Sequence, residues 1–100
     1  MNSIAPLDLQ EKLHNKEELV LIDVREEFEH SDFNIGGTLI PMSNIFEQIE
    51  KIPTNKTVVL YCAKGIRSAM VIQRLEEKYG YINLINLSGG MYAWRKATGE

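Results

Sequence analysis

The apolar positions along the chain gather in short runs that predict buried β-strands. Three runs are rich in β-branched and aromatic residues, and they span residues 19–24, 57–62 and 82–87. The first two lack the polar alternation of a strand with one wet face, which is typical of a parallel sheet covered on both sides. A shorter run at 38–41 follows a Gly-Gly turn, and residues 2–4 suit an edge strand.

Between these runs the sequence carries signals for short helices. A proline suits the first turn of a helix over 6–15, and residues 26–31 indicate an acidic turn or short helix. Ser43 is the expected N-cap of a helix over 44–51. A last helix is expected to begin near Met91.

The longest expected helix follows the 57–62 strand and ends at Gly80, which suits a left-handed stop. Its expected apolar face consists of Ile66, Ala69, Ile72, Leu75 and Tyr79. Strands that alternate with helices in this way predict an α/β fold. We expect a mostly parallel five-stranded sheet with helices on both faces.

Composition narrows the class of protein. The chain has 100 residues, 44% hydrophobic and 25% charged, which suits one domain over 1–100. The formal net charge is −3 and the basic residues are scattered, which argues against nucleic acid as a partner. No basic leader precedes an apolar stretch, and no run nears the roughly 20 residues that span a bilayer. We therefore expect a cytoplasmic protein with no membrane contact.

Cysteine and histidine usage limits the possible chemistry. A single cysteine excludes an internal disulfide, a CxxC dithiol couple and a thiolate-rich zinc site. His14 and His30 fall in polar stretches, with no set of metal ligands around them, and we expect both to be solvated. The sequence therefore predicts no metal site.

The one cysteine, Cys62, lies where a central strand is expected to end. Ligands of open α/β sheets bind beyond the carboxyl ends of the strands. The next helix begins a few residues later, and its free N–H groups and dipole favour an anion. Lys64 and Arg67 add positive charge, and Gly65 permits a curled backbone. This environment favours the thiolate, which is the reactive form of cysteine.

A structural interpretation of Cys62 competes with this one. A cysteine that ends a buried strand is commonly an inert small hydrophobe. A core cysteine, however, does not need a cationic loop with a glycine after it. We therefore interpret Cys62 as a nucleophile whose loop binds substrate. The binding residues are expected to be Ala63, Lys64, Gly65, Ile66, Arg67 and Ser68.

Four short motifs stand in order along the chain: LIDVRE at 21–26, IGGTLIPMS at 35–43, CAKGIRS at 62–68 and LSGGMYAW at 87–94. Together they resemble the rhodanese family. CAKGIRS is similar to its active-site loop, C-x-x-G-x-R-S, and LIDVRE to its Asp-x-Arg strand end. The other two resemble its G-A-x-x-I-P segment and its closing L-x-G-G-x-x-x-W. Gly37 stands where the family usually has alanine, and residues 32–35 depart from its Gly-His-Ile-Pro.

The resemblance implies a rhodanese-like three-layer domain with sulfurtransferase activity. A small anionic donor such as thiosulfate gives its outer sulfur to Cys62, which becomes a persulfide. The persulfide passes that sulfur to cyanide, a small thiol or a thiol protein. No metal or organic cofactor is implied. The residues permit the same chemistry, because a thiolate attacks sulfane sulfur and loop amides hold the product.

Two alternatives remain open. Cysteine phosphatases also pair a strand-end cysteine with an arginine, but in C-x5-R spacing, whereas four residues separate Cys62 from Arg67 here. The loop also lacks an acid to protonate a leaving alcohol. The second alternative is a non-catalytic binding module, which in this family usually lacks the cysteine.

Other residues receive roles from their positions. Arg67 is expected to stabilise the thiolate or donor, or to form a structural ion pair. Asp23 and Arg25 end the neighbouring strand, and we interpret Asp23 as steadying the loops through backbone amides. Ser68 suits a helix cap or a hydrogen bond to sulfur. Ser88-Gly89-Gly90 should form another rim of the site, with the glycines as turn formers.

Overall fold

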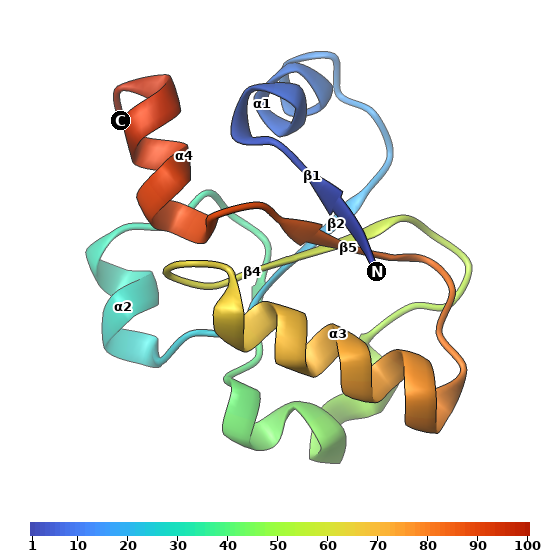
Figure 1. The fold of residues 1–100 in the computed structure, drawn as a ribbon. Coiled ribbons are helices and arrows are strands. Elements are labelled where there is room, and N and C mark those ends of the chain that lie inside the picture. The colour runs from blue at the N-terminus through green and yellow to red at the C-terminus, as the bar shows by residue number, and fades with distance from the viewer.

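Five parallel strands form one sheet in the order β1-β5-β4-β2-β3 in the computed structural model, which describes residues 1–100. β4 lies at the centre and pairs with β2 on one side and β5 on the other, so the predicted parallel sheet is confirmed. The predicted edge strand is β1 (Figure 1). The strand bounds are β1 Asn2–Ile4, β2 Val20–Asp23, β3 Thr38–Leu39, β4 Val58–Tyr61 and β5 Leu84–Leu87.

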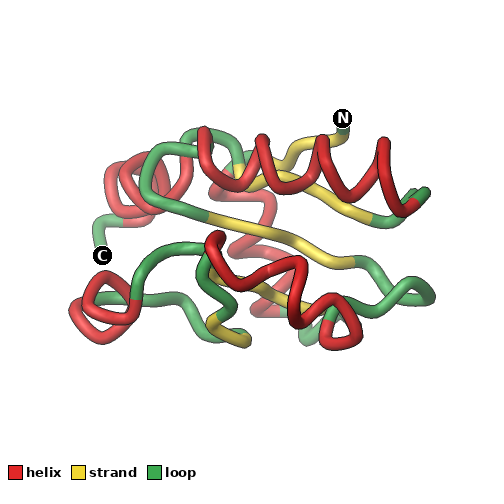
Figure 2. The backbone as a smooth tube through the Cα atoms, turned by 90° about the horizontal axis from the view of Figure 1, so that it is seen from below, coloured by secondary structure: helices red, strands yellow, loops and turns green.

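Helices cover both faces of the sheet. α1 (Pro6–His14) and α4 (Gly90–Thr98) lie together on one face, and α3 (Ile66–Tyr79) lies on the other with the 3-10 segment η1 (Met42–Lys51). Figure 2 turns the α3 and η1 face toward the reader. The short helix α2 (Glu27–Asp32) sits to one side, near the turn that joins β4 to α3 (Figure 1). None of these helices is long and apolar enough to cross a membrane.

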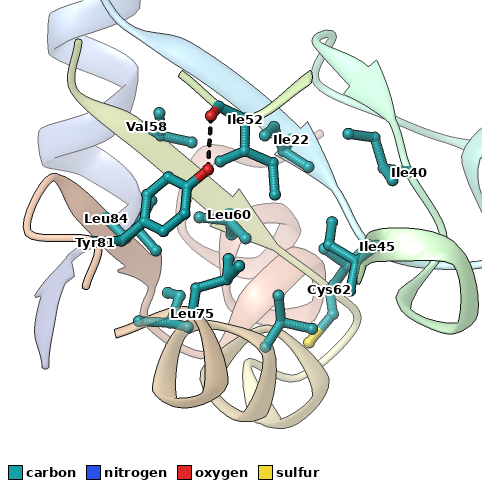
Figure 3. Close-up of a cluster of buried hydrophobic side chains, with 13 residues drawn as sticks. Ile22, Ile40, Ile45, Ile52, Val58, Leu60, Cys62, Leu75, Tyr81 and Leu84 are labelled. Atoms are coloured by element: carbon teal, nitrogen blue, oxygen red, sulfur yellow. Dashed lines mark hydrogen bonds between the residues drawn. The ribbon is translucent and has the colours of Figure 1, made fainter. Parts of the chain in front are cut away.

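Each face of β4 belongs to a separate apolar core. All four residues of β4 are buried, as the unbroken apolar run predicted. Successive side chains of a strand point to opposite faces. Leu60 and Cys62 therefore join the core under α3 and η1 (Figure 3), whereas Val59 and Tyr61 join the core under α1 and α4. Cys62 thus reaches the α3 side of the sheet because of its place in the strand alternation.

One helix expectation was wrong, and a second was right only in part. Ser43 caps no helix: η1 begins at Met42, and the Ser43 hydroxyl contacts only the neighbouring Asn44 side chain. The expected apolar face of α3 was right for Ile72 and Leu75, which are buried, but Ile66 is 65% exposed and Tyr79 is 45% exposed. The buried residues of α3 are Ser68, Val71, Ile72 and Leu75. This i, i+3, i+4, i+7 stripe begins with a serine, so a search for apolar spacing does not find its start.

The connection from β2 to β3 is held by polar contacts. α2 buries none of its residues, and its start is closed by a reciprocal capping box between Glu26 and Glu29. Gly37 follows with φ +88°, a left-handed conformation in which a side chain would also overlap Leu21. Glycine is therefore required at this position, where the resembled family usually has alanine.

Candidate active site

The sulfur of Cys62 accepts hydrogen bonds from the start of α3. The Gly65 N–H group lies 3.1 Å from Sγ and the Ser68 N–H group 3.4 Å from it. The Ser68 hydroxyl oxygen is 3.3 Å from the same sulfur. Cys62 itself is only 1% exposed. The sulfur therefore sits in a small polar nest that is shielded from solvent.

The Cys62 sulfur takes the role of a capping side chain at the start of α3. The N-cap position is Gly65, at φ +87°, and it has no side chain with which to cap. A capping side chain normally accepts a hydrogen bond from the second or third N–H group of the helix. Ser68 is the third residue of α3, and its N–H group points to the Cys62 sulfur instead. The helix terminus and the cysteine thus satisfy each other.

The sulfur also borders an apolar environment. Cys62 belongs to the core cluster that includes Ile45, Val71 and Ile72, and Figure 3 shows its sulfur beside α3. Hydrogen bonds are electrostatically stronger in such surroundings than in water. The arrangement therefore differs from that of an inert core cysteine, because backbone donors converge on a sulfur that water scarcely reaches.

The opposite side of the loop is held by α4. The N–H groups of Met91 and Tyr92 donate to the carbonyls of Cys62 and Ala63 at 2.8 and 2.9 Å. Gly90 allows this approach, since a Cβ there would overlap the Cys62 carbonyl oxygen and lie 2.7 Å from the Ala63 carbonyl carbon. Gly90 adopts φ +61° and turns the chain, as the sequence suggested, but its contact with the loop was missed. The two successive glycines before a helix were the only local signal.

Arg67 forms an ion pair with α2. Its two terminal nitrogens each lie 2.9 Å from an oxygen of Glu29. The Arg67 hydrogen bond is the main reason that the pKa of Glu29 falls from 4.5 to about 2. The same contact raises the pKa of Arg67, with a smaller contribution from the nearby Cys62. Of the two interpretations of Arg67, the one present in the structure is the structural ion pair, here with Glu29.

Asp23 and Arg25 form a buried cluster at the end of β2. Asp23 accepts from the Arg25 backbone N–H group at 3.0 Å and from the Arg25 guanidinium at 2.9 to 3.2 Å. Burial is the largest single effect and works to lower the pKa of Arg25, but the Asp23 hydrogen bond and the negative charge of Asp23 together with smaller nearby contributions outweigh it, and the pKa is raised. The guanidinium also donates to the Phe33 carbonyl. Both side chains thus contact the 26–36 connection rather than the sulfur.

The expectation of two solvated histidines was wrong for His30. Its Nδ1 atom lies 2.8 Å from a carboxylate oxygen of Asp23, and its side chain is 22% exposed. The cause is the short helix α2, which brings His30 back to Asp23 at the end of β2. His14 is exposed as expected. The structure holds no group of three His, Cys, Asp or Glu side chains that could bind a metal.

Asn86 is a site residue that sequence reasoning missed. It lies on β5, is 8% exposed, and donates from Nδ2 to the Gly65 carbonyl at 3.1 Å. Its Oδ1 atom accepts the Ser68 hydroxyl at 2.5 Å. The signal was a polar residue inside the apolar run INLINL. Lys64, by contrast, is exposed and takes part in no ion pair.

The fold is an α/β domain with a cysteine loop at the end of its central strand, and the comparisons with known proteins identify its family. The Rhodanese-like domain family model matches residues 5–97, and the chain therefore belongs to the rhodanese-like family. It is 37% identical to the putative sulfurtransferase YtwF of Bacillus subtilis, over 98% of this chain and 94% of that protein.

Two further relatives support the same assignment. The chain is 39% identical to the probable adenylyltransferase/sulfurtransferase MoeZ of Mycobacterium tuberculosis, over 95% of this chain but only 25% of that protein's length. It is 34% identical to a rhodanese-like domain protein of Staphylococcus aureus of known structure, with a TM-score of 0.84 over 94% of this chain and 91% of that one. The three-layer rhodanese-like fold expected from the sequence is thus confirmed.

Proposed function

We propose that the chain transfers sulfane sulfur from a small anionic donor, such as thiosulfate, to a thiophilic acceptor through a persulfide on Cys62. The observation that carries this proposal is the pair of backbone N–H groups, from Gly65 and Ser68, that point to the Cys62 sulfur. Such donors stabilise a thiolate before the reaction and negative charge on sulfur during it.

The reaction proceeds in two displacements. The Cys62 thiolate attacks the outer sulfur of thiosulfate, the bond between the two thiosulfate sulfurs breaks, and sulfite leaves with the electron pair. The product is a Cys62 persulfide anion. A cyanide ion or a thiolate then attacks the outer sulfur, and the Cys62 thiolate leaves. Each step moves one sulfur atom and conserves charge, so neither step needs an added oxidant or reductant.

The loop has free donors for the outer sulfur. The N–H groups of Lys64, Ile66 and Arg67 donate to no other group of the protein. Lys64 lies in the turn after the cysteine, and Ile66 and Arg67 are the first two residues of α3. We assign them, together with Ala63, to binding the persulfide and the donor. Lys64 is exposed and adds a positive charge that attracts an anionic donor.

The acceptor is proposed from chemistry alone. A small thiol or the cysteine of a thiol protein is the natural thiophilic acceptor in a reducing compartment, and we place the activity in the cytoplasm on that ground. Cyanide serves as a convenient acceptor in the assay. The proposal involves neither nucleic acid nor a membrane.

A phosphatase is the second candidate, and the position of Arg67 argues against it. A phosphatase arginine must hold the phosphoryl oxygens with its guanidinium fork. Here both terminal nitrogens of Arg67 are bound to Glu29, and the spacing from Cys62 is one residue shorter than in C-x5-R. A tight loop suits one sulfur atom better than a tetrahedral phosphate.

The test measures two activities and the binding of a partner, with one matched variant. Wild type mixed with thiosulfate and cyanide should release thiocyanate and sulfite in equal amounts, and Cys62→Ser should release neither. Equal rates of thiocyanate release by the two proteins would contradict the proposal. Turnover of an aryl phosphate without sulfur transfer would identify a phosphatase. Neither activity, together with binding of a partner that Cys62→Ser retains, would indicate a binding module.

A further inference from the structure

Asn86 bridges Gly65 of the cysteine loop and Ser68 in the first turn of α3. Its side chain is held at both ends, by the Gly65 carbonyl and by the Ser68 hydroxyl. Gly65 and Ser68 are also the residues whose N–H groups donate to Cys62. One side chain on β5 therefore contacts both residues whose N–H groups donate to the sulfur, but not the sulfur itself.

The contacts of Asn86 fix the direction of every proton in this chain of groups. The Gly65 carbonyl can only accept, so the Asn86 amide must present Nδ2 to it. Oδ1 then faces Ser68 and can only accept, so the Ser68 hydroxyl donates its single hydrogen to Asn86. The Ser68 oxygen, 3.3 Å from Sγ, therefore has only its lone pairs to offer to Cys62.

This orientation of the Ser68 hydroxyl favours the neutral thiol of Cys62 over the thiolate. A neutral thiol can donate its own hydrogen to those lone pairs. A thiolate has no hydrogen to give and would face the lone pairs of Ser68. To bind a thiolate, the Ser68 hydroxyl must turn its hydrogen from Asn86 to the sulfur and leave Oδ1 of Asn86, which is buried, without a donor.

We propose that Asn86 is a positioning residue that holds the hydroxyl hydrogen of Ser68 away from Cys62 and thereby sets the share of Cys62 present as thiolate. When the thiol proton leaves to solvent, the Ser68 hydrogen turns from Asn86 to the sulfur; S–H is the only covalent bond broken. The Ser68 hydrogen again has two possible acceptors, Asn86 and the sulfur, when Cys62 regains negative charge as the leaving group in sulfur transfer. Only this last step rests on the proposed function.

Other charges around the sulfur stay the same when residue 86 is changed. Lys64 and Arg67 lie on the loop and on α3, while β5 and the first turn of α4 carry no charged residue. The charged residues of η1 and the remaining charged residues of α3, apart from a half-buried Glu76, are exposed. The further charged or titratable groups on the neighbouring elements are Asp23, Arg25, Glu26, Glu27, Glu29, His30, Asp32, Tyr61, Tyr79 and Tyr92.

Two substitutions of similar shape separate the proposal from a purely structural role. Leucine and aspartate share the branched outline of asparagine. Both substitutions remove the Nδ2 donor to the Gly65 carbonyl. Asn86→Leu also removes the acceptor and frees the Ser68 hydrogen for the sulfur, whereas Asn86→Asp keeps an acceptor for Ser68 and, when ionised, adds negative charge. If Asn86 only braced the loop, both substitutions would loosen the N–H groups from Cys62 and would disfavour the thiolate alike.

The measurement is the pH dependence of alkylation by iodoacetamide, which reports on one site because Cys62 is the only cysteine. The midpoint of the rate profile should fall by about one pH unit in Asn86→Leu and rise by about one unit in Asn86→Asp, the effect of one hydrogen bond to a charged group. Circular dichroism and urea titration check that each variant folds. Should Asn86→Leu not fold, Asn86→Ala removes the same acceptor.

A double-mutant cycle shows whether Asn86 acts through Ser68. In a Ser68→Ala background, Asn86→Leu should move the midpoint by less than about 0.3 unit, since there is no hydroxyl hydrogen to release. A rise in both single variants, an unmoved midpoint in Asn86→Leu, or a full shift without Ser68 would overturn the inference. These outcomes need no sulfur donor, so they are independent of the thiocyanate assay that tests the proposed function.

Discussion

The guanidinium of Arg67 and the carboxylate of Glu29 meet in a two-point ion pair, with both N–O distances at 2.9 Å. The two residues are 38 positions apart in the chain. The pair joins the first turn of α3, which bears the cysteine loop, to α2, which buries no residue of its own. The placement of α2 beside the site therefore depends on polar contacts, and this dependence can be measured.

We expect the ion pair to make stability pH-dependent in acid. The pKa of Glu29 is about 2 in the folded protein and 4.5 in the absence of these contacts, so its contribution is complete above pH 4.5 and is lost as the pH falls toward 2. The pair is partly exposed, so the effect should stay below about 1 kcal/mol. Urea titrations should show Glu29→Gln less stable than wild type at pH 6, with a smaller gap at pH 3. A gap that does not depend on pH would contradict this.

Arg67 should contribute more to activity than its partner does. Both Arg67→Ala and Glu29→Gln break the pair, but only Arg67→Ala removes the positive charge beside Cys62. We expect Arg67→Ala to lower kcat/KM for thiosulfate at least about tenfold more than Glu29→Gln does, which corresponds to about 1.4 kcal/mol. Equal losses in the two variants would mean that Arg67 serves only to hold α2.

A side chain at Gly90 should displace the loop from α4. Gly90→Ala places an alanine at φ +61° and drives its Cβ into the carbonyls of Cys62 and Ala63. Gly80→Ala is the matched control, because Gly80 has φ +71° with nothing within 4 Å of its Cβ. The control should cost about 1 kcal/mol in urea titrations, and Gly90→Ala about 2 kcal/mol more, with loss of sulfur transfer. Similar behaviour of the two variants would show that the contact does not support the loop.

Removing the Asp23 carboxylate should greatly lower the free energy of unfolding. Asp23 is 0% exposed and Arg25 is 5% exposed, so Asp23→Ala leaves a buried guanidinium without its partner. We expect a loss of about 3 kcal/mol or more in the free energy of unfolding. Lys12→Ala, which breaks the exposed pair with Glu17, should cost about 0.5 kcal/mol or less. A mild effect of Asp23→Ala would show that the cluster is not essential to the fold.

Local sequence patterns were enough to predict the sheet, the strand-end position of Cys62 and the helix that follows it. Each of these depends on neighbouring residues, such as an unbroken apolar run or Gly65 before a helix start. The contacts that were missed join distant positions. Asn86 lies 18 residues from Ser68, and Glu29 lies 38 residues from Arg67. No spacing rule links such residues, because only the order of strands in the sheet brings them together.

Ser68 shows why a pattern can mislead even within one helix. The buried stripe of α3 begins with this serine, whose hydroxyl bonds Asn86 and whose N–H group bonds the Cys62 sulfur. A polar residue with both groups satisfied can occupy a core position. Apolar periodicity cannot reveal it, and the predicted face was therefore rotated toward Ile66, which is exposed.

If Cys62 carries the transferred sulfur, mass spectrometry of the peptide that contains Cys62 will detect it. After incubation with thiosulfate and removal of excess donor, the peptide that contains Cys62 should gain about 32 Da, the mass of one sulfur atom, and should lose it again on addition of cyanide. Cys62→Ser should show no gain. A wild-type peptide whose mass stays unchanged, while thiocyanate is still released, would contradict the persulfide account.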